Sequence, residues 1–569
     1  MTISNLKFGI MCGDTTSFPK WQADAITLLI DNKQIECSLL IQNGLEKPRN
    51  FSSRLRLLKY NSFLWQIYSY ILGRRSIATK SVSLSKELSK IPKIVCNVLK
   101  QGNFSEFFNR NDVEHIKSYK LDFILRFEFG IIKGCVLNSA KYGVWSFHHG
   151  DEQEYRGGPP GFWEIYHGSR ITGSMLQRLN DKLDAGIVLK KCFLETQLEY
   201  ISNRDQMFLE SSKWPLQVSL DILNNDKLFL SQDASSTKTN IKVAPTNRQF
   251  IFFILKTNIK KIKELLYMLI YVDYWNIGIS FDKPESFLID NKKPVVKWFP
   301  LKSKKMFYAD PCGLKSSNGY DIFFEEYQYK QAKGVISYTN YTNGVFTKPK
   351  VVLEEEFHLS YPFLVEDKGC VYMIPESYEA NKVMLYEATE FPMKWKMVKV
   401  LIDNYSGVDN TLIKHNKTWW MFSSDKNKGS SHNLNLFYAD DLMSAWTPHP
   451  SNPIKTDIRS SRSAGKPFIY NDNIYRPSMD YSEKNEGGIT INIITSLTKS
   501  EYGEDAIKSI FPYKDSNFPD KIHHLYSMGD YTLVDGCKKI FILKSIDIVM
   551  RQLTLVLNRV LKKIGLNNG

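Results

Sequence analysis

A repeat of aromatic strands in the second half of the sequence constrains the fold more than any other feature. From about residue 272, helical periodicity vanishes and five segments share a polar turn, an aromatic pair or near-pair, and a strand leading to acidic or hydroxyl residues. The segments are NGYDIFFEE (318–326), KGCVYMIPES (368–377), NKTWWMFSSD (416–425), NDNIYRPSMD (471–480) and MGDYTLVDG (528–536), about 50 residues apart. Such a period predicts a five-bladed β-propeller with four strands per blade. An irregular β-sandwich with coincidental spacing is the alternative.

The first half of the chain instead alternates short apolar strands with helices. KFGIMCGD (7–14) and IECSLLIQNG (35–44) predict two buried strands, joined by a helix in SFPKWQADAITLLID (17–31). Two further strands are predicted in YKLDFILRFEFGII (119–132) and KYGVWSFHHG (141–150). Continuously apolar strands with helical crossovers are typical of a parallel sheet that is covered on both faces. The pattern predicts a Rossmann-like α/β domain.

With 569 residues the chain is too long for one hydrophobic core, so we expect a multidomain protein. We predict an α/β domain over 1–235, with a mostly helical insertion at about 45–110, followed by a helical linker over 236–271. The propeller would occupy 272–540, and an amphipathic helix would follow over 541–569. That last helix carries basic residues, so it would either dock on the protein or lie on an anionic membrane.

Composition narrows the class of partner. The net charge of +15 favours anionic partners such as nucleotide-linked substrates or a membrane surface. No nucleic acid is expected, because the sequence has no RNA-binding motif and no dense Arg/Lys block. The eight cysteines lack CxxC or Cys/His spacing, which predicts free thiols in a reducing cytosol and no metal site. Without a signal peptide or a long uncharged apolar run, the protein is expected to be cytoplasmic, at most peripheral to the inner membrane surface.

The segment VWSFHHGDEQEYRGGPPGFWEIYHG (144–168) carries the chemistry expected of the first domain. His148 follows Ser146 by two residues, so both side chains face the same side of a strand. Ligands of open α/β sheets bind beyond the carboxyl ends of the strands, where His148 and His149 are predicted to lie. Asp184, in a tight Asp-Ala-Gly turn, offers a carboxylate that can orient an imidazole. Such a pair is a general acid/base unit suited to acyl transfer.

These residues resemble the folate-dependent formyltransferases, which include glycinamide ribonucleotide, methionyl-tRNA and sugar-nucleotide N-formyltransferases. The motifs that carry the resemblance are Ser146-Phe147-His148, Tyr155-Arg156-Gly157-Gly158-Pro159, Gly173-Ser174 and Leu183-Asp184-Ala185-Gly186, and it covers roughly residues 1–230. It implies formyl transfer from 10-formyltetrahydrofolate to an amine, with His148 as the acid/base at the tetrahedral intermediate and Asp184 as its orienting partner. The folate is expected to contact Phe127, Gly130, Arg156 and Gly157.

The chain departs from this family at one position. The family's Asn, whose amide steadies the oxyanion, is Ser146 here, and losing an oxyanion donor costs ~10²–10³ in rate. His149 is expected to substitute as a donor. A relic domain, or one that uses a different acyl donor, is the alternative.

Carboxylates recur at similar places in the aromatic repeats. In a small propeller the strands converge on a central channel, so these groups can meet there. The predicted sugar pocket comprises Asp310, Glu325, Glu376, Asp409, Arg462 and Arg476. The two arginines would suit a phosphate or uronate, and two carboxylates about 5–10 Å apart are what glycoside hydrolysis requires. A purely structural set of acidic turns is the alternative.

The region from about 272 to 540 resembles the N-terminal propeller of plant glucosamine inositolphosphorylceramide transferases, in FYADP, PESYEANKVMLYEA, HPSNPIKTDIRSSRSAG and IYRPSMD. ADP and VDNTL are also similar to five-bladed glycosidases of the family-43 type. In the plant enzymes a separate domain is the glycosyltransferase, and the sequence has no sign of it. The resemblance implies a propeller that binds glycan.

Together these features predict a formyltransferase that acts on an amine of a sugar or glycan precursor, nucleotide- or lipid-linked. The donor would be 10-formyltetrahydrofolate, and the propeller would hold the carbohydrate. A glycosidase or glycosyltransferase centred on the propeller is one alternative. A non-catalytic glycan-binding protein with a degenerate formyltransferase domain is another. The oligomeric state is left open.

Overall fold

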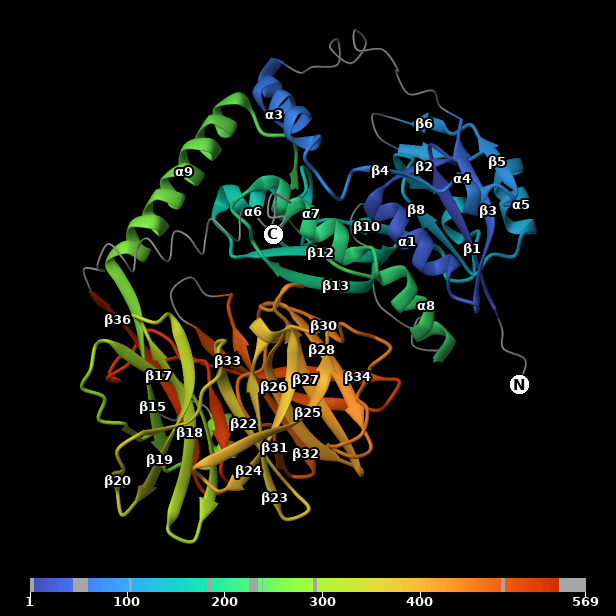
Figure 1. The fold of residues 1–569 in the computed structure, drawn as a ribbon. Coiled ribbons are helices and arrows are strands. Elements are labelled where there is room, and N and C mark those ends of the chain that lie inside the picture. Colours follow the sequence, from blue (N-terminus) through green and yellow to red (C-terminus); the bar gives the residue numbers. More distant parts are fainter. Residues whose placement is uncertain are drawn as a thin grey trace. The chain divides into compact units, whose positions relative to one another are not determined.

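The structure, a computed structural model, describes residues 5–44, 60–101, 105–181, 186–224, 234–237, 239–289, 294–482 and 487–541 (Figure 1). The chain divides into two compact units, Met1–Ile259 (unit 1) and Lys260–Gly569 (unit 2). Asp184 and the predicted C-terminal helix beyond residue 541 lie outside the described residues. Among the described helices, none combines the length and the apolar character needed to cross a bilayer.

Unit 1 is built on one seven-stranded sheet of order β13-β12-β10-β8-β1-β3-β5 (Figure 1). Its strands are β1 (Leu6–Cys12), β3 (Ile35–Asn43), β5 (Lys93–Cys96), β8 (Phe123–Arg126), β10 (Val144–His148), β12 (Ile171–Arg178) and β13 (Ile187–Glu195). The first five of these run parallel, whereas β12 and β13 pair antiparallel. The four predicted strands are therefore present and parallel; β1 and β3 are close to the predicted bounds, whereas β8 and β10 occupy only part of the predicted segments.

Both faces of this sheet are buried, which explains why its strands are continuously apolar. In β1, Phe8 and Ile10 belong to one core cluster and Met11 to another on the opposite face. The first cluster includes side chains of α1 (Lys20–Ile30), α7 (Tyr200–Ser211) and α8 (Trp214–Asn224). The second includes those of α5 (Arg110–Ser118).

The prediction of a mostly helical insertion at 45–110 is wrong for its described part. After η1 (Tyr60–Ser62) and α3 (Phe63–Gly73) come β4 (Ser81–Ser83), α4 (Ser85–Leu88), β5, β6 (Leu99–Gln101) and β7 (Ser105–Phe107). β5 extends the main sheet by pairing with β3. Only alternate residues of β5 are buried, and four residues are too few for the sequence to display that period.

The remaining elements of unit 1 are short, apart from one helix. They are β2 (Ser17–Pro19), β9 (Ile131–Lys133), η2 (Cys135–Asn138), β11 (Arg156–Gly157), α6 (Phe162–His167), β14 (Ile241–Lys242) and α9 (Asn247–Ile270), which runs on into unit 2. β14 pairs with β11, so the predicted linker begins as a strand tied to unit 1.

Unit 2 is all-β over its described residues after α9 and contains five antiparallel sheets there (Figure 1). The first combines β15 (Tyr271–Ser280), β16 (Val296–Trp298), β35 (Leu525–Ser527) and β36 (Thr532–Phe541). The second has β17 (Met306–Ser316), β18 (Gly319–Gln328), β19 (Lys333–Thr342), β20 (Val345–Phe346) and β21 (Lys350–Leu353). The third has β22 (Ser360–Asp367), β23 (Cys370–Glu376), β24 (Lys382–Glu390) and β25 (Lys394–Asp403).

The last two sheets complete the unit. The fourth has β26 (Gly407–His415), β27 (Thr418–Asp425), β28 (Asn433–Ala439), β29 (Thr447–Pro448) and β30 (Lys455–Thr456). The fifth has β31 (Phe468–Tyr470), β32 (Asn473–Asp480), β33 (Gly488–Leu497) and β34 (Tyr502–Ile510). Two short 3₁₀ helices, η4 (Pro284–Leu288) and η5 (Tyr378–Ala380), lie between strands.

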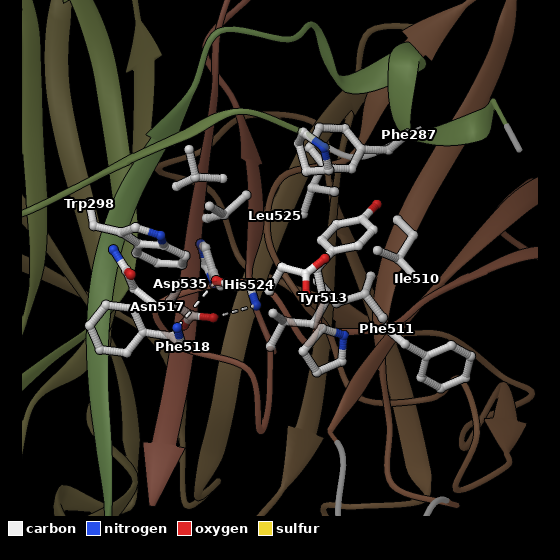
Figure 2. A pocket seen from close by; sticks show the side chains of 18 residues that line it. Phe287, Trp298, Ile510, Phe511, Tyr513, Asn517, Phe518, His524, Leu525 and Asp535 are labelled. Carbon is white, nitrogen blue, oxygen red and sulfur yellow. Dashed lines mark hydrogen bonds between the residues drawn. The ribbon is translucent and has the colours of Figure 1, made fainter. Parts of the chain in front are cut away.

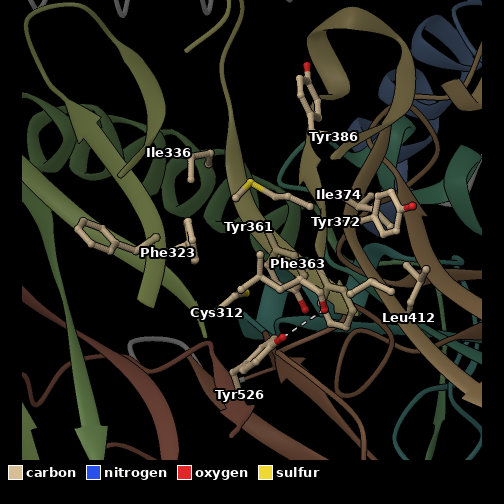
Figure 3. Packing of buried hydrophobic residues seen from close by; sticks show 14 of the residues in the cluster. Cys312, Phe323, Ile336, Tyr361, Phe363, Tyr372, Ile374, Tyr386, Leu412 and Tyr526 are labelled. Carbon is tan, nitrogen blue, oxygen red and sulfur yellow. Dashed lines mark hydrogen bonds between the residues drawn. The ribbon is translucent and has the colours of Figure 1, made fainter. Parts of the chain in front are cut away.

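The aromatic repeats mark equivalent strands. Four of them coincide with β18, β23, β27 and β32, each the second strand of its sheet. The fifth falls on β36, which pairs with β15, so one sheet contains strands from the beginning and the end of the unit. Phe323, Phe363, Leu412 and Tyr526, from four different sheets, belong to one buried cluster (Figure 3). Phe323, Tyr372 and Trp419, which belong to three of the aromatic repeats, are members of this cluster, so these repeats contribute to a core shared between sheets.

Candidate functional site

In unit 1 the carboxyl ends of β8 and β10 bring together two predicted residues and one that sequence reasoning missed. Ser146 on β10 lies opposite Arg126 on the parallel neighbour β8. The Arg126 Nη1 donates a hydrogen bond of 2.7 Å to Ser146 Oγ, and Nη2 donates to the carbonyls of Phe129 and Gly130. Because the Ser146 oxygen accepts from a cation, its own O–H is polarised and can donate elsewhere. Arg126 can be identified only from the register of β8 and β10, which the sequence alone does not provide.

His148 ends β10, and its ring orientation is fixed by the backbone. Its Nε2 lies 3.0 Å from the carbonyl oxygen of Tyr155. A carbonyl only accepts, so Nε2 carries the hydrogen, and in the neutral ring Nδ1 carries the lone pair. A Cβ at Gly150 would lie 2.6 Å from that carbonyl and 3.0 Å from Nε2, so glycine is needed beside the ring. Both Ser146 and His148 are buried.

His149 lies with the aromatic side chains on the other side of the strand from Ser146. Its ring stacks on Phe147 and contacts Trp21 and Phe208 edge-on, and Nε2 lies 3.1 Å from Ser211 Oγ. Burial, and secondarily the charge of His148, lowers the pKa of His149 to about 3. The structure does not bring His149 to Ser146, and its surroundings suit packing better than the donor role that we expected.

The four residues expected to contact folate are spread around this strand end. Phe127 packs against Trp21 and Phe147, and the Gly130 N–H donates to Glu106 Oε2 at 2.6 Å. Arg156 Nη1 donates to the Thr239 carbonyl at 3.2 Å. Gly157 has φ +83°, and a Cβ there would lie 2.3 Å from the Lys242 carbonyl, so the pairing of β11 with β14 requires glycine. Gly130, Arg156 and Gly157 therefore have contacts within the chain itself.

In unit 2 three strands share an unusual backbone feature. The register shifts between Ala309 and Cys312 in β17, between Ser360 and Phe363 in β22, and between Val408 and Thr411 in β26. Each shift contains a non-glycine residue with positive φ, namely Asp310 (51°), Tyr361 (44°) or Asp409 (50°). Such bulges re-aim a side chain at a cost in backbone strain, and they are frequent at functional sites. The same kind of bulge therefore positions one side chain in each of three sheets.

Asp310 lies beside a pair that the sequence analysis missed, His523 and Asp535. The His523 Nδ1 is 2.5 Å from Asp535 Oδ2, and its Nε2 is 3.4 Å from Asp310 Oδ1. Asp535 also accepts from the backbone N–H groups of His523 and His524 at 3.0 and 3.1 Å. Asp310 Oδ1 is buried and has no hydrogen-bond partner among the described residues. A bound hydroxyl would satisfy it.

Charges within this group shift one another's pKa values. Burial alone would lower the pKa of His523, but Asp535 and Asp310 raise it to about 9. Burial works to raise the pKa of Asp535, yet His523 holds it below the ordinary value. Burial raises the pKa of Asp310 to about 7, against the opposing charge of His523. Near neutral pH an imidazolium therefore lies between an ionised Asp535 and a partly protonated Asp310.

Donor atoms of Asp310, His523 and Asp535 lie within 4.8 Å of one another, a spacing that a metal ion can bridge. A cation would have to displace the proton on His523, whose pKa is about 9. The imidazolium already supplies the positive charge that these two carboxylates need. We therefore keep the expectation of no metal here, as a prediction.

Asp409 and Glu376 form the next part of the group. The Arg462 Nε bonds Asp409 Oδ2, and Arg462 Nη2 lies 3.9 Å from Glu376 Oε2. Glu376 Oε2 also accepts from the Asp409 backbone N–H at 3.1 Å. Burial and the charge of Asp409 raise the pKa of Glu376 to about 8. Glu376 is thus mainly a neutral carboxylic acid at pH 7, close to an ion pair.

Glu325 completes the group, which we call the acid cluster: Asp310, Glu325, Glu376, Asp409 and Asp535. Burial first, and then the charges of Asp310 and Glu376, raises the pKa of Glu325 well above its ordinary value. Its Oε1 lies 3.6 Å from His358 Nε2. Asp310, Glu325, Glu376, Asp409 and Arg462 thus lie close enough for their charges to interact, and a sugar pocket lined by them stays a prediction.

Arg476 differs from the other predicted pocket residues. It is fully buried, and its Nε and Nη2 donate to Glu504 at 2.8 and 2.7 Å. Its remaining hydrogen bonds go to the carbonyls of Ser460 and Ser461. With its donors directed at Glu504 and these carbonyls, Arg476 acts as a structural cation in the fifth sheet.

A cavity of about 310 Å³ shares one residue, Asp535, with the acid cluster, and none of the predicted sugar-pocket residues lines it. Figure 2 shows aromatic side chains of Phe287, Trp298 and Tyr513 around it, together with His524 and Asp535. Apolar walls with a few convergent polar groups are typical of a small-molecule site. Sequence reasoning missed this cavity because its walls come from segments more than 200 residues apart.

The acid cluster predicts how the stability of unit 2 depends on pH. The folded pKa values of Asp310, Glu376 and His523 lie above those of the unfolded chain, at about 7, 8 and 9. The folded unit therefore holds more protons, and the free energy of unfolding falls as pH rises from about 6.5 to 9, by at least about 1 kcal/mol. Below pH 6.5 the lowered pKa values of His524 and His358, each about 4, oppose this trend.

Urea unfolding across pH 6–9.5, followed by hydrogen exchange in peptides of β17 and β26, measures this slope. The variant His523→Gln should be flatter over pH 6.5–9 than the parent protein. A stability that rises over this window would contradict the assigned protonation states.

A comparison with known protein families places one match within unit 2. The family model described as "Glucosamine inositolphosphorylceramide transferase 1, N-terminal" matches residues 298–521. Glucosamine inositolphosphorylceramide transferase 1 of Oryza sativa subsp. japonica is 33% identical over 205 residues, which are 35% of this chain and 27% of that protein. The chain thus matches only about a quarter of the length of this plant relative.

The formyltransferase likeness comes from a different relative. A methionyl-tRNA formyltransferase of Prochlorococcus marinus is 34% identical over 139 residues, 24% of this chain and 40% of that protein. Among solved structures, a family 117 glycoside hydrolase of Zobellia galactanivorans covers 42% of this chain and is itself covered over 88%, at 12% identity and a TM-score of 0.32. The chain is therefore a fusion that joins a formyltransferase-like segment to an all-β segment like the N-terminal part of glucosamine inositolphosphorylceramide transferase 1.

Proposed function

We propose that this chain transfers a formyl group from 10-formyltetrahydrofolate to an amine of a sugar or glycan precursor. The catalytic centre would lie in unit 1, on a Rossmann-like sheet, and unit 2 would bind the carbohydrate. The observation that carries the proposal is the arrangement of Arg126, Ser146 and His148 at the carboxyl ends of two adjacent parallel strands. It pairs an oriented imidazole with a polarised hydroxyl donor, the two groups that acyl transfer to an amine requires.

The chemistry follows from these side chains. The folate donor supplies the formyl carbon, which forms a bond to the substrate amine as its bond to the donor nitrogen breaks. Ser146, polarised by Arg126, donates to the formyl oxygen as negative charge develops there. His148 accepts a proton from the attacking amine at Nδ1 and returns it to the departing nitrogen. The Tyr155 carbonyl, which accepts from Nε2, holds the ring for this transfer, and we propose that Asp184 helps to move protons there.

For unit 2 we propose that the five sheets are five propeller blades around a central channel that the acid cluster lines. Buried carboxyl oxygens accept hydrogen bonds from sugar hydroxyls, and Asp310 Oδ1, which has no hydrogen-bond partner among the described residues, supports this proposal. The name of the plant relatives contains glucosamine and inositolphosphorylceramide, which supports an amino-sugar or lipid-linked acceptor. We assign the activity to the cytoplasm.

A direct assay tests the proposal. The purified full-length chain is incubated with 10-formyltetrahydrofolate carrying a labelled formyl group and with amino-sugar nucleotides or glucosaminyl lipids. We expect label on the acceptor amine together with stoichiometric release of tetrahydrofolate. If no acceptor takes up label and a folate analogue fails to bind in calorimetry, formyl transfer by unit 1 is ruled out.

A second candidate function is cleavage of a glycosidic bond in unit 2. It is favoured by the raised pKa values of Asp310 and Glu376, about 7 and 8, beside the ionised Asp535. A neutral carboxylic acid near a carboxylate is the pairing that glycoside hydrolysis uses. In that case Asp310→Asn would abolish hydrolysis while His148→Ala would leave it intact. Sugar binding without turnover and without folate binding would instead identify a non-catalytic scaffold.

A further inference from the structure

The helix α9 has two apolar faces, and only one of them is used by the fold. Phe250, Phe253 and Thr257 are buried on one side. The two phenylalanines join an aromatic cluster with Trp65 and Phe162. This face accounts for the attachment of α9 to unit 1.

The second apolar face is exposed. It consists of Ile251, Phe252, Leu255, Ile259, Ile262 and Leu266, which we call the exposed stripe. At 100° per residue these positions fall within one sector of about 100°, opposite the buried face. Each side chain is between 49% and 58% exposed. Single exposed apolar residues are ordinary on a soluble protein, but a continuous row of six along one helix marks an interaction surface.

Basic residues flank the exposed stripe. Lys263 and Lys256 lie along one edge, although the Lys256 Nζ also donates to the Tyr166 carbonyl at 2.6 Å, and Lys261 lies farther from the other edge; all three are exposed. Arg248 adds an exposed cation at the start of the helix. Glu264 is the single acidic residue of α9, and it pairs with Lys260 at 3.9 Å. The helix therefore presents an apolar centre with cationic margins.

A neighbouring helix has the same character. α3 is joined to the start of α9 by hydrogen bonds of Asn247 with Leu64 N and Tyr60 O, and by the packing of Tyr68 on Phe250. Away from that contact, α3 exposes Ile71 at 54% and ends in basic Arg74 and Arg75. The combination of exposed apolar and basic residues therefore extends over two packed helices.

We propose that α9 docks its exposed stripe onto an anionic lipid surface. A helix lies in the membrane interface when one face is apolar and its margins carry Lys and Arg that reach the headgroups. The cationic margins favour anionic lipids over an apolar protein groove, because each lysine near such a surface adds attraction that salt screens. The proposal is independent of formyl transfer and of the C-terminal segment considered above. It would bring the enzyme to membrane-bound acceptors.

Vesicle flotation of the full-length protein tests the proposal. At low salt we expect binding to vesicles of 7:3 phosphatidylcholine and phosphatidylglycerol, and much weaker binding to phosphatidylcholine alone. The double variant Leu255→Glu/Ile259→Glu should lower the partition coefficient about tenfold or more. The matched control Val345→Glu/Val351→Glu changes two exposed apolar residues of unit 2 and should bind as the parent does. Circular dichroism verifies that both variants are folded.

Three results would overturn the proposal. The first is binding that the Leu255→Glu/Ile259→Glu variant retains, and the second is equal binding to neutral and anionic vesicles. The third is a parent protein that does not float with vesicles. In that third case light scattering separates the remaining occupants: a dimer that the variant dissociates means that a second copy covers the exposed stripe, whereas a monomer leaves this face to another segment of the chain.

Discussion

Replacing Arg476 with methionine is expected to lower the free energy of unfolding of unit 2 by about 3–5 kcal/mol. The guanidinium is fully buried and makes two hydrogen bonds to Glu504, at 2.8 and 2.7 Å. Burial works to raise the pKa of Glu504, but Arg476 and then Lys455 hold it at about 2. Removing Arg476 leaves a buried carboxylate whose remaining cation is Lys455, at 2.7 Å. The loss comes mainly from the charge and hydrogen bonds that Arg476 supplied to this carboxylate, which Lys455 replaces only in part.

Urea unfolding of the full chain, with hydrogen exchange in peptides of β32 and β34 as the readout for unit 2, measures the change. The control is Lys394→Met, which breaks an ion pair with Glu390 that is exposed on both sides, and a loss below about 0.5 kcal/mol is expected there. The double variant Arg476→Met/Glu504→Leu should recover part of the loss, because it removes the buried carboxylate and leaves only the partly exposed Lys455 without that partner. A loss for Arg476→Met that is no larger than the control's would mean that Glu504 is solvated.

Arg476 illustrates which structural features the sequence does not reveal. The aromatic repeats located β18, β23, β27 and β32, because period and composition are properties of the sequence itself. The partner of Arg476 lies on β34, two strands away in the same sheet. That pairing depends on the register of the strands and on which face of its strand each residue occupies. A shift of one residue in register would move a side chain to the opposite face. The sequence therefore does not distinguish an arginine that binds a ligand from an arginine that stabilises the fold.

The acid cluster likewise contains residues that the sequence revealed and residues that it did not. Asp310 and Asp409 were found because carboxylates recur at similar places in the aromatic repeats, and the structure places both at a bulge with positive φ. His523 and Asp535 were missed, although they control the protonation of Asp310. Asp535 lies on β36 and His523 just before β35, in the first sheet, which is assembled from both ends of unit 2, and no local pattern indicates that closure. In unit 1 Arg126 was missed for a related reason, since only the parallel register of β8 and β10 sets it against Ser146.

His148→Ala is expected to lower kcat for formyl transfer by ~10²–10⁴, the usual contribution of a general acid/base. The imidazole of His148 lies at the end of β10. The hydrogen bond of its Nε2 to the Tyr155 carbonyl leaves Nδ1 as the nitrogen that exchanges a proton. Stopped-flow or discontinuous measurement of tetrahydrofolate release gives kcat and KM separately. A proton-transfer role predicts a loss in kcat with KM nearly unchanged, whereas a binding role predicts the reverse.

Two matched variants make this result interpretable. His115→Ala removes an exposed histidine of α5 in the same unit and should leave kcat unchanged. His149→Phe keeps an aromatic ring among Trp21 and Phe208 and removes any donor, so it should retain most of the activity if that side chain only packs. If His148→Ala retains full kcat while the protein still transfers formyl groups, the proton must move through another group. The arrangement of Arg126, Ser146 and His148 would then be structural, and the catalytic centre of unit 1 would have to lie elsewhere.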